Sequence, residues 1–457
     1  MSFDMLGKAV ELLFSYPLCD YCLGRQFARL GYGLSNKQRG EALKITIAML
    51  IHSWIEEEKE LEKAKEITVN GSLNNVISVL EKKTGEKLAK KKCTLCGDML
   101  SEVKFREFAE RIYRELKTYE FRTFLTGAVV PPAIRENEDR IRAEFNIATG
   151  EDIKNDITRG IGKRIAELTG AKVEYLNPDI TILVDYFNDT FQLQVNPVFI
   201  YGVYLKHRRY IPQTIWFCRR CWGRGCASCN YTGREYETSV SELVGIPAME
   251  YFEALDYKFH AAGREDVDAL VEGTGRPFVL ELKHPRKRFL DLKKLEALIN
   301  ERSRGAVEVR ELRYSSRREL RELKAMSPRA SKTYVAEVVF DSFVDPSKLA
   351  EVEEKFRNIM VEQRTPTRVL RRRSDRVRQK LLHEVKVLEH QGNRVVFRVR
   401  TQGGLYVKEL IDGDNGRTRP SIAELLEARP EQILLSVVEV ENKPSREQQL
   451  SSGVEAK

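Results

Sequence analysis

The sequence predicts an α+β protein of two or three domains, on the basis of three observations. The chain has 457 residues, enough for several hydrophobic cores, and 42% of them are hydrophobic, which argues against disorder over most of its length. Its first half mixes helical and strand patterns, whereas its second half places strands between long basic insertions. All eight cysteines fall into C-x-x-C pairs, a spacing typical of metal-binding segments.

The net positive charge of the chain is small, but its arginines are clustered. Lys and Arg outnumber Asp and Glu by 77 to 68, a net charge of +9. Five arginines lie between Arg310 and Arg321, and six between Arg368 and Arg378. Such blocks are typical of chains that neutralise phosphates. Glutamates are interspersed in the first block, which favours a solvated helix face there, so the acid-poor second block is the better candidate for phosphate contacts.

The cysteines predict two structural zinc sites. No apolar run is long enough to cross a bilayer and the first residues lack a secretion-signal pattern, so we expect a cytoplasmic protein with reduced thiols. Two residues between thiolates let both reach one ion at about 2.3 Å, so two pairs complete a tetrahedral site without an open position. The expected ligands of one or two zinc ions are Cys19, Cys22, Cys93 and Cys96, then Cys218, Cys221, Cys226 and Cys229.

The first half divides at a charged stretch. Residues 1–64 are expected to form a helical segment that contributes to the first zinc site, since Ile47, Leu50 and Trp54 share one helix face. Residues 65–205 are expected to form an α/β domain that carries the rest of that site. Within it we expect a helix over 151–168 and a hairpin of strands 180–187 and 190–195.

The second half follows a zinc knuckle. Residues 206–235 are expected to link the halves, with Gly223 and Gly225 permitting tight turns. The arginines of this linker could touch RNA, although a structural staple is the simpler interpretation. Residues 236–441 are expected to form the second domain, and the polar tail 442–457 to be disordered. The strands expected in that domain are 277–283, 333–340 and 394–400, and the helices are 350–360 and 422–426.

Three short motifs of the second domain carry the candidate chemistry. An Asp after Gly-Arg commonly ends a strand or caps a helix, and a strand tyrosine is most often a packing residue, so each motif alone is weak. Their joint occurrence is hard to attribute to chance. The motifs are Gly263-Arg-Glu-Asp266, Lys332-Thr-Tyr334, and Gly403-Gly-Leu-Tyr-Val-Lys-Glu-Leu410.

With the zinc pairs and these motifs, nearly the whole chain resembles the THUMP-containing tRNA pseudouridine synthases of archaea and eukaryotes, which act on tRNA uridines 54 and 55. The stretch 191–210 is similar to the THUMP domain, an RNA-binding module. The resemblance implies a C-terminal pseudouridine-synthase fold, with a central mixed, mostly antiparallel sheet flanked by helices. It also implies a monomer that binds tRNA and takes no small-molecule cosubstrate and no organic cofactor.

The same resemblance implies catalytic roles. Asp266 stands at the position of the nucleophilic Asp, since the family spacing Gly-Arg-x-Asp selects it over Asp268. Tyr334 matches the tyrosine that stacks on the target base and is placed to move a proton at C5. Tyr406 matches a second tyrosine that contacts the substrate.

It also implies supporting roles. Lys408 matches a basic residue that pairs with the catalytic Asp, and Leu410 packs beneath it. Arg264 would help to extrude the uridine and occupy its place. The loops 327–332 and 363–376 would contact backbone phosphates, and the second is similar to the family's thumb loop, where Arg-Thr-Pro recurs.

The chemistry needs few groups. Uridine becomes pseudouridine when the glycosidic bond breaks, the base turns and it rejoins through C5, without redox change or group transfer. A carboxylate nucleophile, attacking C1′ or C6, stays ionised in a closed pocket only beside a cation. Unstacking the base costs a few kcal/mol, which an aromatic face partly offsets.

Two other classes compete with this interpretation. A different THUMP-bearing enzyme, of the thiolase or methyl-transferring type, needs a Gly-rich nucleotide loop, which the sequence does not contain. A non-catalytic zinc- and tRNA-binding protein needs only a structural Asp266. Within the favoured class, uridine 54, uridine 55 or both remain open as targets.

Overall fold

The protein is described by a computed structural model that covers residues 4–328, 330–370 and 373–441. The disorder expected for 442–457 therefore concerns residues outside this description. The internal contacts divide the chain into two units, Met1–Asn196 and Pro197–Lys457. Within the described ranges, no helix is both long and apolar enough to cross a membrane.

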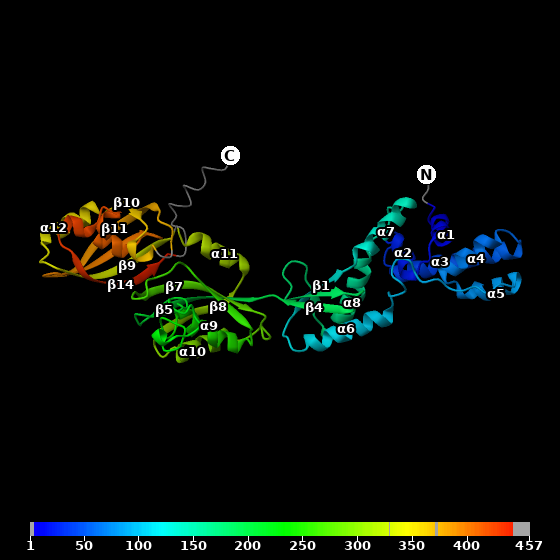
Figure 1. The fold of residues 1–457 in the computed structure, drawn as a ribbon, viewed down its shortest axis with the longest axis horizontal. Coiled ribbons are helices and arrows are strands. Elements are labelled where there is room, and N and C mark those ends of the chain that lie inside the picture. The colour runs from blue at the N-terminus through cyan, green and yellow to red at the C-terminus, as the bar shows by residue number, and fades with distance from the viewer. Residues whose placement is uncertain (1–3, 329, 371–372, 442–457) are drawn as a thin grey trace. The chain divides into compact units, whose positions relative to one another are not determined.

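Unit 1 joins a helical part to a small α/β part through one hydrophobic core (Figure 1). That core runs without a break from Ala9 to Val195. The segments 1–64 and 65–205, expected as separate domains, therefore share a core up to Val195. The helices are α1 (Met5–Ser15), α2 (Asp20–Gln26), α3 (Asn36–Glu56), α4 (Leu61–Gly71), α5 (Asn74–Thr84), α6 (Glu102–Leu116), α7 (Pro132–Glu144) and α8 (Ile153–Thr169).

A four-stranded sheet forms the α/β part of unit 1, in the order β2-β1-β3-β4. β1 runs parallel to β2 and β3, while β3 and β4 form the antiparallel hairpin predicted from the sequence. Helix α8, also predicted, packs on β1 and on α6. The strands are β1 (Thr123–Val129), β2 (Lys172–Val173), β3 (Ile180–Asp185) and β4 (Thr190–Val195).

A buried arginine ties α2 to α7 and α8. The side chain of Arg25 is fully buried, and its Nε lies 2.7 Å from Oε1 of Glu138. Its Nη1 lies 2.9 Å from Oδ2 of Asp156. Since the two carboxylates come from α7 and α8, one guanidinium fixes three helices. The geometry suits arginine because its donors form a planar fork.

Unit 2 is built on one large sheet, ordered β13-β10-β11-β12-β9-β14-β7-β5-β8 with β6 on β7 (Figure 1). Among the described strands of this sheet, all pairs are antiparallel except β7 with β14, which confirms the mixed, mostly antiparallel sheet. The strands are β5 (Val198–Lys206), β6 (Asp256–Ala261), β7 (Leu270–Lys283), β8 (Val307–Ser315), β9 (Ser331–Phe340), β10 (Ile359–Arg364), β11 (Val377–Gln391), β12 (Arg394–Gln402), β13 (Thr418–Arg419) and β14 (Pro430–Val440).

The helices of unit 2 cover two large hydrophobic clusters and a small third one beneath α11, and Tyr334 of β9 packs against both large clusters. The predicted helix 422–426 is confirmed, whereas the helix expected over 350–360 starts earlier, because Asp345 caps it and Pro346 occupies its first turn. The helices are α9 (Val240–Tyr251), α10 (Leu292–Arg302), α11 (Arg317–Met326), α12 (Pro346–Lys355), α13 (Val407–Asp412) and α14 (Ile422–Leu426).

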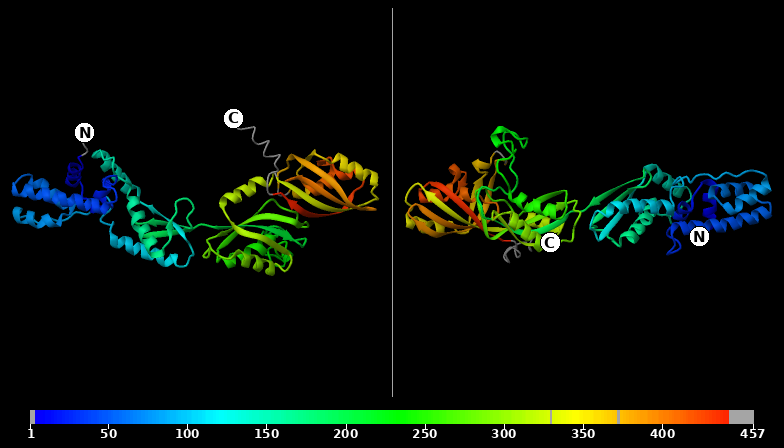
Figure 2. Two further views of the ribbon diagram at one scale, coloured as in Figure 1. Left: turned by 180° about the vertical axis from the view of Figure 1, so that it is seen from behind. Right: turned by 90° about the horizontal axis from the view of Figure 1, so that it is seen from below.

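The division between the units falls earlier than the sequence suggested. β5, expected within 65–205, lies in the sheet of unit 2 between β7 and β8. Its nine residues are nearly all buried, as in a strand covered on both faces. The zinc knuckle, expected to link the halves, is consequently an insertion within unit 2. It projects as a small bright-green lobe between β5 and α9 (Figure 2, right).

We expect Arg25→Met to loosen unit 1, because it leaves two buried carboxylates without their cation. Breaking a buried pair costs about 3–5 kcal/mol. Amide hydrogen exchange in α7 and α8 should therefore accelerate by roughly 100-fold or more. Arg135→Met is the control, since Arg135 pairs with Asp152 at the surface of α7. Equal exchange rates in the two variants would contradict the structural role of Arg25.

Candidate active site and zinc centres

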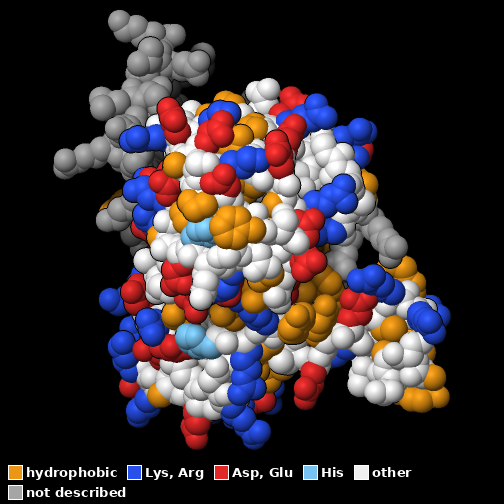
Figure 3. All heavy atoms as spheres, turned by 90° about the vertical axis from the view of Figure 1, so that its left-hand side faces the viewer, with side chains coloured by type: hydrophobic (Ala, Val, Ile, Leu, Met, Phe, Trp, Pro, Cys, Tyr) orange, Lys and Arg blue, Asp and Glu red, His pale blue; other side chains and the backbone are white. Residues whose placement is uncertain are grey.

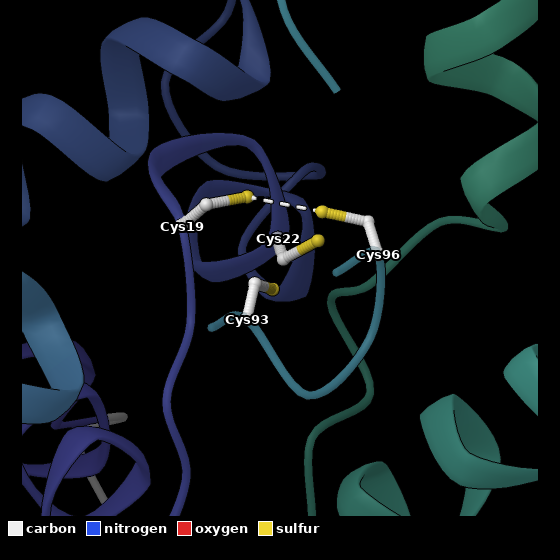
Figure 4. A group of neighbouring side chains, drawn as sticks. All are labelled: Cys19, Cys22, Cys93 and Cys96. Atoms are coloured by element: carbon white, nitrogen blue, oxygen red, sulfur yellow. Dashed lines mark hydrogen bonds between the residues drawn. The ribbon is translucent and has the colours of Figure 1, made fainter. Parts of the chain in front are cut away.

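The first cysteine group joins segments far apart in the sequence (Figure 4). Cys19 precedes α2 and Cys22 lies within it, while Cys93 and Cys96 come from the turn after α5. All four Sγ atoms lie within 4.8 Å of one another, and Cys19 and Cys96 are 3.5 Å apart. A tetrahedral zinc ion separates its sulfurs by about 3.8 Å, so the group fits zinc. Arg25 Nη2 also donates to the Sγ of Cys22, at 3.4 Å.

The second group is compact and fits zinc equally well. Its Sγ atoms also lie within 4.8 Å of one another, with Cys218 and Cys226 3.9 Å apart. Backbone N–H groups of Gly225 and Gly233 donate to the Sγ atoms of Cys221 and Cys229, both at 3.2 Å. Such donors stabilise thiolates, the form that binds metal. Zinc held by either group would serve as a structural crosslink, because four protein ligands fill its coordination sphere.

The candidate catalytic carboxylate lies on a short loop between β6 and β7. Gly263 begins the loop with φ +89°. A Cβ there would lie 2.5 Å from Nζ of Lys332, so both the conformation and the space require glycine. The Asp266 side chain is 31% exposed, and so remains reachable by a substrate. The loop backbone is therefore packed against buried cations while its Asp faces outward.

The neighbouring Glu265 anchors the loop. Its side chain is fully buried, and its Oε2 lies 3.0 Å from Nε of the equally buried Arg276. The hydroxyl of Tyr204 donates to Oε2 at 2.8 Å, and the amide of Gln213 donates to the same oxygen at 3.2 Å. Arg276 also donates to the carbonyl of Ala262 at 2.8 Å. Strands β5 and β7 thus fix the residue directly before Asp266.

Lys206, the last residue of β5, and Arg209 beyond it hold the other side of the loop. Lys206 is fully buried and donates to the carbonyls of Ile211 and Val267, at 2.9 and 3.1 Å. Burial lowers its pKa to about 8. Arg209 donates to the carbonyl of Asp268 at 2.5 Å. The backbone of the Asp266 loop therefore has hydrogen-bond partners both before and after Asp266.

Arg368 is the cation that meets the candidate nucleophile. Its Nη1 lies 2.7 Å from Oδ1 of Asp266, and its Nε lies 2.6 Å from Oε1 of Glu409. Burial opposes the charge of Arg368, but its two carboxylate partners raise its pKa. Burial raises the pKa of Glu409, and Arg368 opposes this. One guanidinium thus connects the Asp266 loop to α13.

Two tyrosines stand near this pair. Burial raises the pKa of Tyr334, Arg276 opposes the shift, and the charge of Asp266 adds to it. Tyr406 lies directly before α13, and its backbone exchanges two hydrogen bonds with the buried Gln363, at 2.8 and 2.9 Å. The guanidinium of Arg368 lies 6.0 Å from the centre of the Tyr406 ring, within cation–π range.

Lys332, next to Tyr334 on β9, is a second buried cation at the site. Burial and, to a smaller extent, the charge of Arg276 together lower its pKa to about 7. It donates to the carbonyl of Ala262 at 3.4 Å. Its side chain therefore lies behind the Asp266 loop.

The expected partner of Asp266 differs from the one observed. Lys408 was expected to pair with it, but its Nζ lies 2.5 Å from Oδ2 of Asp268 instead. Lys408 sits in the first turn of α13 and reaches Asp268, two residues farther along the loop. Leu410 is fully buried in the core beneath α13. Arg264 is exposed, and its side chain makes no ion pair with the described residues.

Sequence reasoning missed Arg368 and Glu409 as a pair. Arg368 ends the segment Arg364-Thr-Pro-Thr-Arg368, which the sequence indicated only as a phosphate contact. Glu409 follows Lys408 directly, so an acidic residue beside the expected cation was the available signal. The buried partners of Glu265 had no such signal, since they come from distant strands.

The two arginine blocks behave differently. In 310–321, Arg310, Arg313 and Arg318 pair with nearby glutamates at the surface. Of these three, only Arg318 lies on a helix face as predicted, because Arg310 and Arg313 belong to strand β8. In 363–376, Arg364 pairs with Asp375 at 2.7 Å. Residues 329 and 371–372 of the expected phosphate-binding loops lie outside the described residues. On the face drawn in Figure 3, Lys and Arg are mixed with Asp and Glu rather than gathered in one patch.

Comparison with known proteins fits this architecture. The family model "Pus10, C-terminal" matches residues 199–441, and "Pus10 THUMP domain, archaeal" matches 108–185. The first match begins within β5, in agreement with the division between the units. The fold and the site thus define the class: a pseudouridine-synthase domain that follows a THUMP domain.

Curated relatives identify the family. A tRNA pseudouridine synthase Pus10 of Methanopyrus kandleri is 41% identical over 95% of this chain and 98% of its own. One of Archaeoglobus fulgidus is 46% identical over 74% of this chain and 92% of its own. The chain belongs to the Pus10 family. Among solved structures, a Cbf5–Nop10–Gar1 complex matches 44% of this chain and 45% of that one, with 20% identity and a TM-score of 0.28, too low to carry an argument.

Metal analysis of the purified full chain should give about two zinc ions, one for each set of four cysteines. Cys22→Ser should remove one ion and Cys226→Ser the other, because each substitution leaves three thiolates in a different unit. Each variant serves as the control for the other. A single ion in the unaltered chain, or loss of both from one substitution, would show that a site is misassigned.

Proposed function

We propose that this protein isomerises uridine 54, uridine 55 or both in tRNA, with Asp266 as the nucleophile. The observation that carries the proposal is the contrast between two adjacent carboxylates. Glu265 is buried and paired with the buried Arg276, whereas Asp266 is partly exposed and paired with the partly exposed Arg368. The environment of Glu265 is typical of a structural carboxylate, and that of Asp266 is typical of a reactive one. The names of the Pus10 relatives support tRNA as the substrate.

The surrounding groups suit the reaction. The guanidinium of Arg368 lies against Asp266 and would offset desolvation of the carboxylate when the base binds. When Asp266 attacks C1′, an ester bond to C1′ forms as the bond between N1 and C1′ breaks; after the base turns, C5 attacks C1′ and the ester bond breaks, which frees the carboxylate. When Asp266 attacks C6 instead, its bond to C6 breaks again after C5 has joined C1′. The proton on C5 must then leave, and the hydroxyl of Tyr334 is the candidate to move it. Its raised pKa keeps this hydroxyl neutral, so it takes the C5 proton only as it passes its own proton on to water, while N1 gains the proton that the product carries there.

Other residues would hold the RNA. Arg264 is exposed beside Asp266, and its planar side chain could fill the gap left by an extruded uridine. Tyr406 offers a ring face near Arg368 for the base. We propose a monomer that needs no organic cofactor or small-molecule cosubstrate. The loops 327–332 and 363–376 remain candidates for phosphate contacts.

The test is tritium release from tRNA transcripts labelled at C5 of uridine. Asp266→Asn should lower the rate at least about 1,000-fold, because an amide is no nucleophile. Asp268→Asn is the matched control and should lose far less. Transcripts with cytidine at position 54 or 55 separate the two targets. Activity in Asp266→Asn would exclude the nucleophile, and no release by the unaltered protein from any tRNA would favour a binding protein.

The two cations of the site can be separated in the same assay. Arg368→Met should lower kcat roughly 30-fold, the equivalent of about 2 kcal/mol for a lost charged partner. Lys408→Met should cost less, because Lys408 pairs with Asp268. A larger loss in Lys408→Met would show that Lys408 takes over Asp266 in the RNA complex. Arg364→Met, on the same segment as Arg368 but paired with Asp375, is the control for general loss of charge.

A further inference from the structure

The knuckle, residues 217–234, exposes more aromatic surface than a structural crosslink needs. Trp222 is 82% exposed and Tyr231 is 78% exposed, and Phe217 at its base is 59% exposed. Exposed aromatic rings in a folded domain commonly mark a binding surface. The reaction proposed above makes no use of these residues.

The zinc ligands fix the backbone that carries the two outer rings. Trp222 and Tyr231 both have positive φ, +53° and +59°, which is uncommon for aromatic residues. Trp222 follows the ligand Cys221, and its N–H donates to the carbonyl of Cys218 at 2.9 Å. The N–H of Tyr231 donates to the carbonyl of Cys226 at 2.9 Å. The rings are therefore presented by a rigid loop, which lowers the entropy lost on binding.

The turns that carry these rings touch each other. A Cβ at Gly225 would lie 2.7 Å from the carbonyl oxygen of Tyr231. A Cβ at Gly233 would lie 2.4 Å from that of Gly223, the residue after Trp222. Glycines thus permit the backbones to meet, at Tyr231 itself and at the residue after Trp222.

The charge of the knuckle is positive. It contains four arginines and no acidic residue, and Ala227 is its one aliphatic residue. A hollow of about 840 Å³ lies against it, lined by three of the arginines and by hydroxyl and amide groups, with Glu235 and Glu237 at its edge. Arg219 pairs with Glu235, whereas Arg220 donates to the neutral Ser228 at 2.9 Å. Arg224, the fourth arginine, is exposed.

We propose that the knuckle docks unpaired nucleotides of the substrate tRNA, with Trp222 and Tyr231 stacking on bases and Arg220 and Arg224 contacting phosphates. Rings stack on any base that is free of a duplex, and arginines meet the backbone. A protein partner is the weaker fit, because residues 217–234 contain a single aliphatic residue, Ala227, and four arginines without an acidic residue. This inference rests on the proposed function for the identity of the RNA.

The test compares RNA binding by the full chain and its variants. Trp222→Ala/Tyr231→Ala should raise the Kd for tRNA and for a single-stranded oligonucleotide by at least about 10-fold, since a stacked base contributes about 1–3 kcal/mol. Binding of a blunt RNA duplex should change little. Trp222→Phe/Tyr231→Phe should stay within about threefold, because phenylalanine still stacks. The control is Phe343→Ala, which removes a 69% exposed ring elsewhere in unit 2.

Zinc content must accompany each Kd. If the alanine variant keeps its zinc and binds single-stranded RNA like the unaltered protein, the inference is overturned. If the alanine variant loses zinc, the double variant Arg220→Gln/Arg224→Gln tests the inference in its place. For this double variant, the slope of log K against log salt concentration should be shallower by the equivalent of about two phosphate contacts. An unchanged slope would overturn the inference.

Isomerisation separates this inference from the proposed function. At saturating tRNA the alanine variant should keep its rate of tritium release, because Asp266 and its partners are untouched. A protein that releases no tritium but loses RNA affinity in the alanine variant would retain the docking surface and refute the isomerase. If the alanine variant releases tritium at the full rate and its RNA affinity is unchanged, the isomerase is retained and the docking surface is refuted.

Discussion

The candidate active site depends on one buried ion pair, Arg276 with Glu265. Two charges without water are costly unless their remaining hydrogen-bonding groups are satisfied. Here the hydroxyl of Tyr204 and the amide of Gln213 complete the carboxylate, so the pair has one stable arrangement. The pair thus fixes the backbone directly before Asp266, whose own side chain is 31% exposed.

The site is assembled from three places in the sheet of unit 2. The β6–β7 loop supplies Asp266, β9 supplies Tyr334, and the passage into α13 supplies Tyr406. Tyr334 packs against both large hydrophobic clusters, so it stands where the two halves of the core meet. Arg368 then joins the loop to α13 through Glu409. Long-range strand order, rather than any local segment, brings these groups together.

The sequence predicted features that depend on neighbouring residues and missed contacts between residues far apart in the chain. The C-x-x-C spacing was sufficient for both zinc groups, and alternating apolar residues were sufficient for β7, β9 and β12. The position of β5 could not be predicted, because a buried strand looks the same in either neighbouring sheet. The sequence likewise could not predict which cation pairs with Asp266. Lys408 and Arg368 are both cations of the correct kind, and only the geometry of α13 directs Lys408 to Asp268.

The base of the knuckle has an evolutionary consequence. Phe217 and Arg234 form an antiparallel bridge, and Glu235 donates its N–H to the carbonyl of Trp216 at 2.9 Å. The chain therefore leaves the domain and returns to it at the same point. A closed excursion of this kind can be shortened, exchanged or lost between lineages without disturbing the strands on either side. Selection can thus alter the knuckle as an independent module while the residues around Asp266 stay fixed.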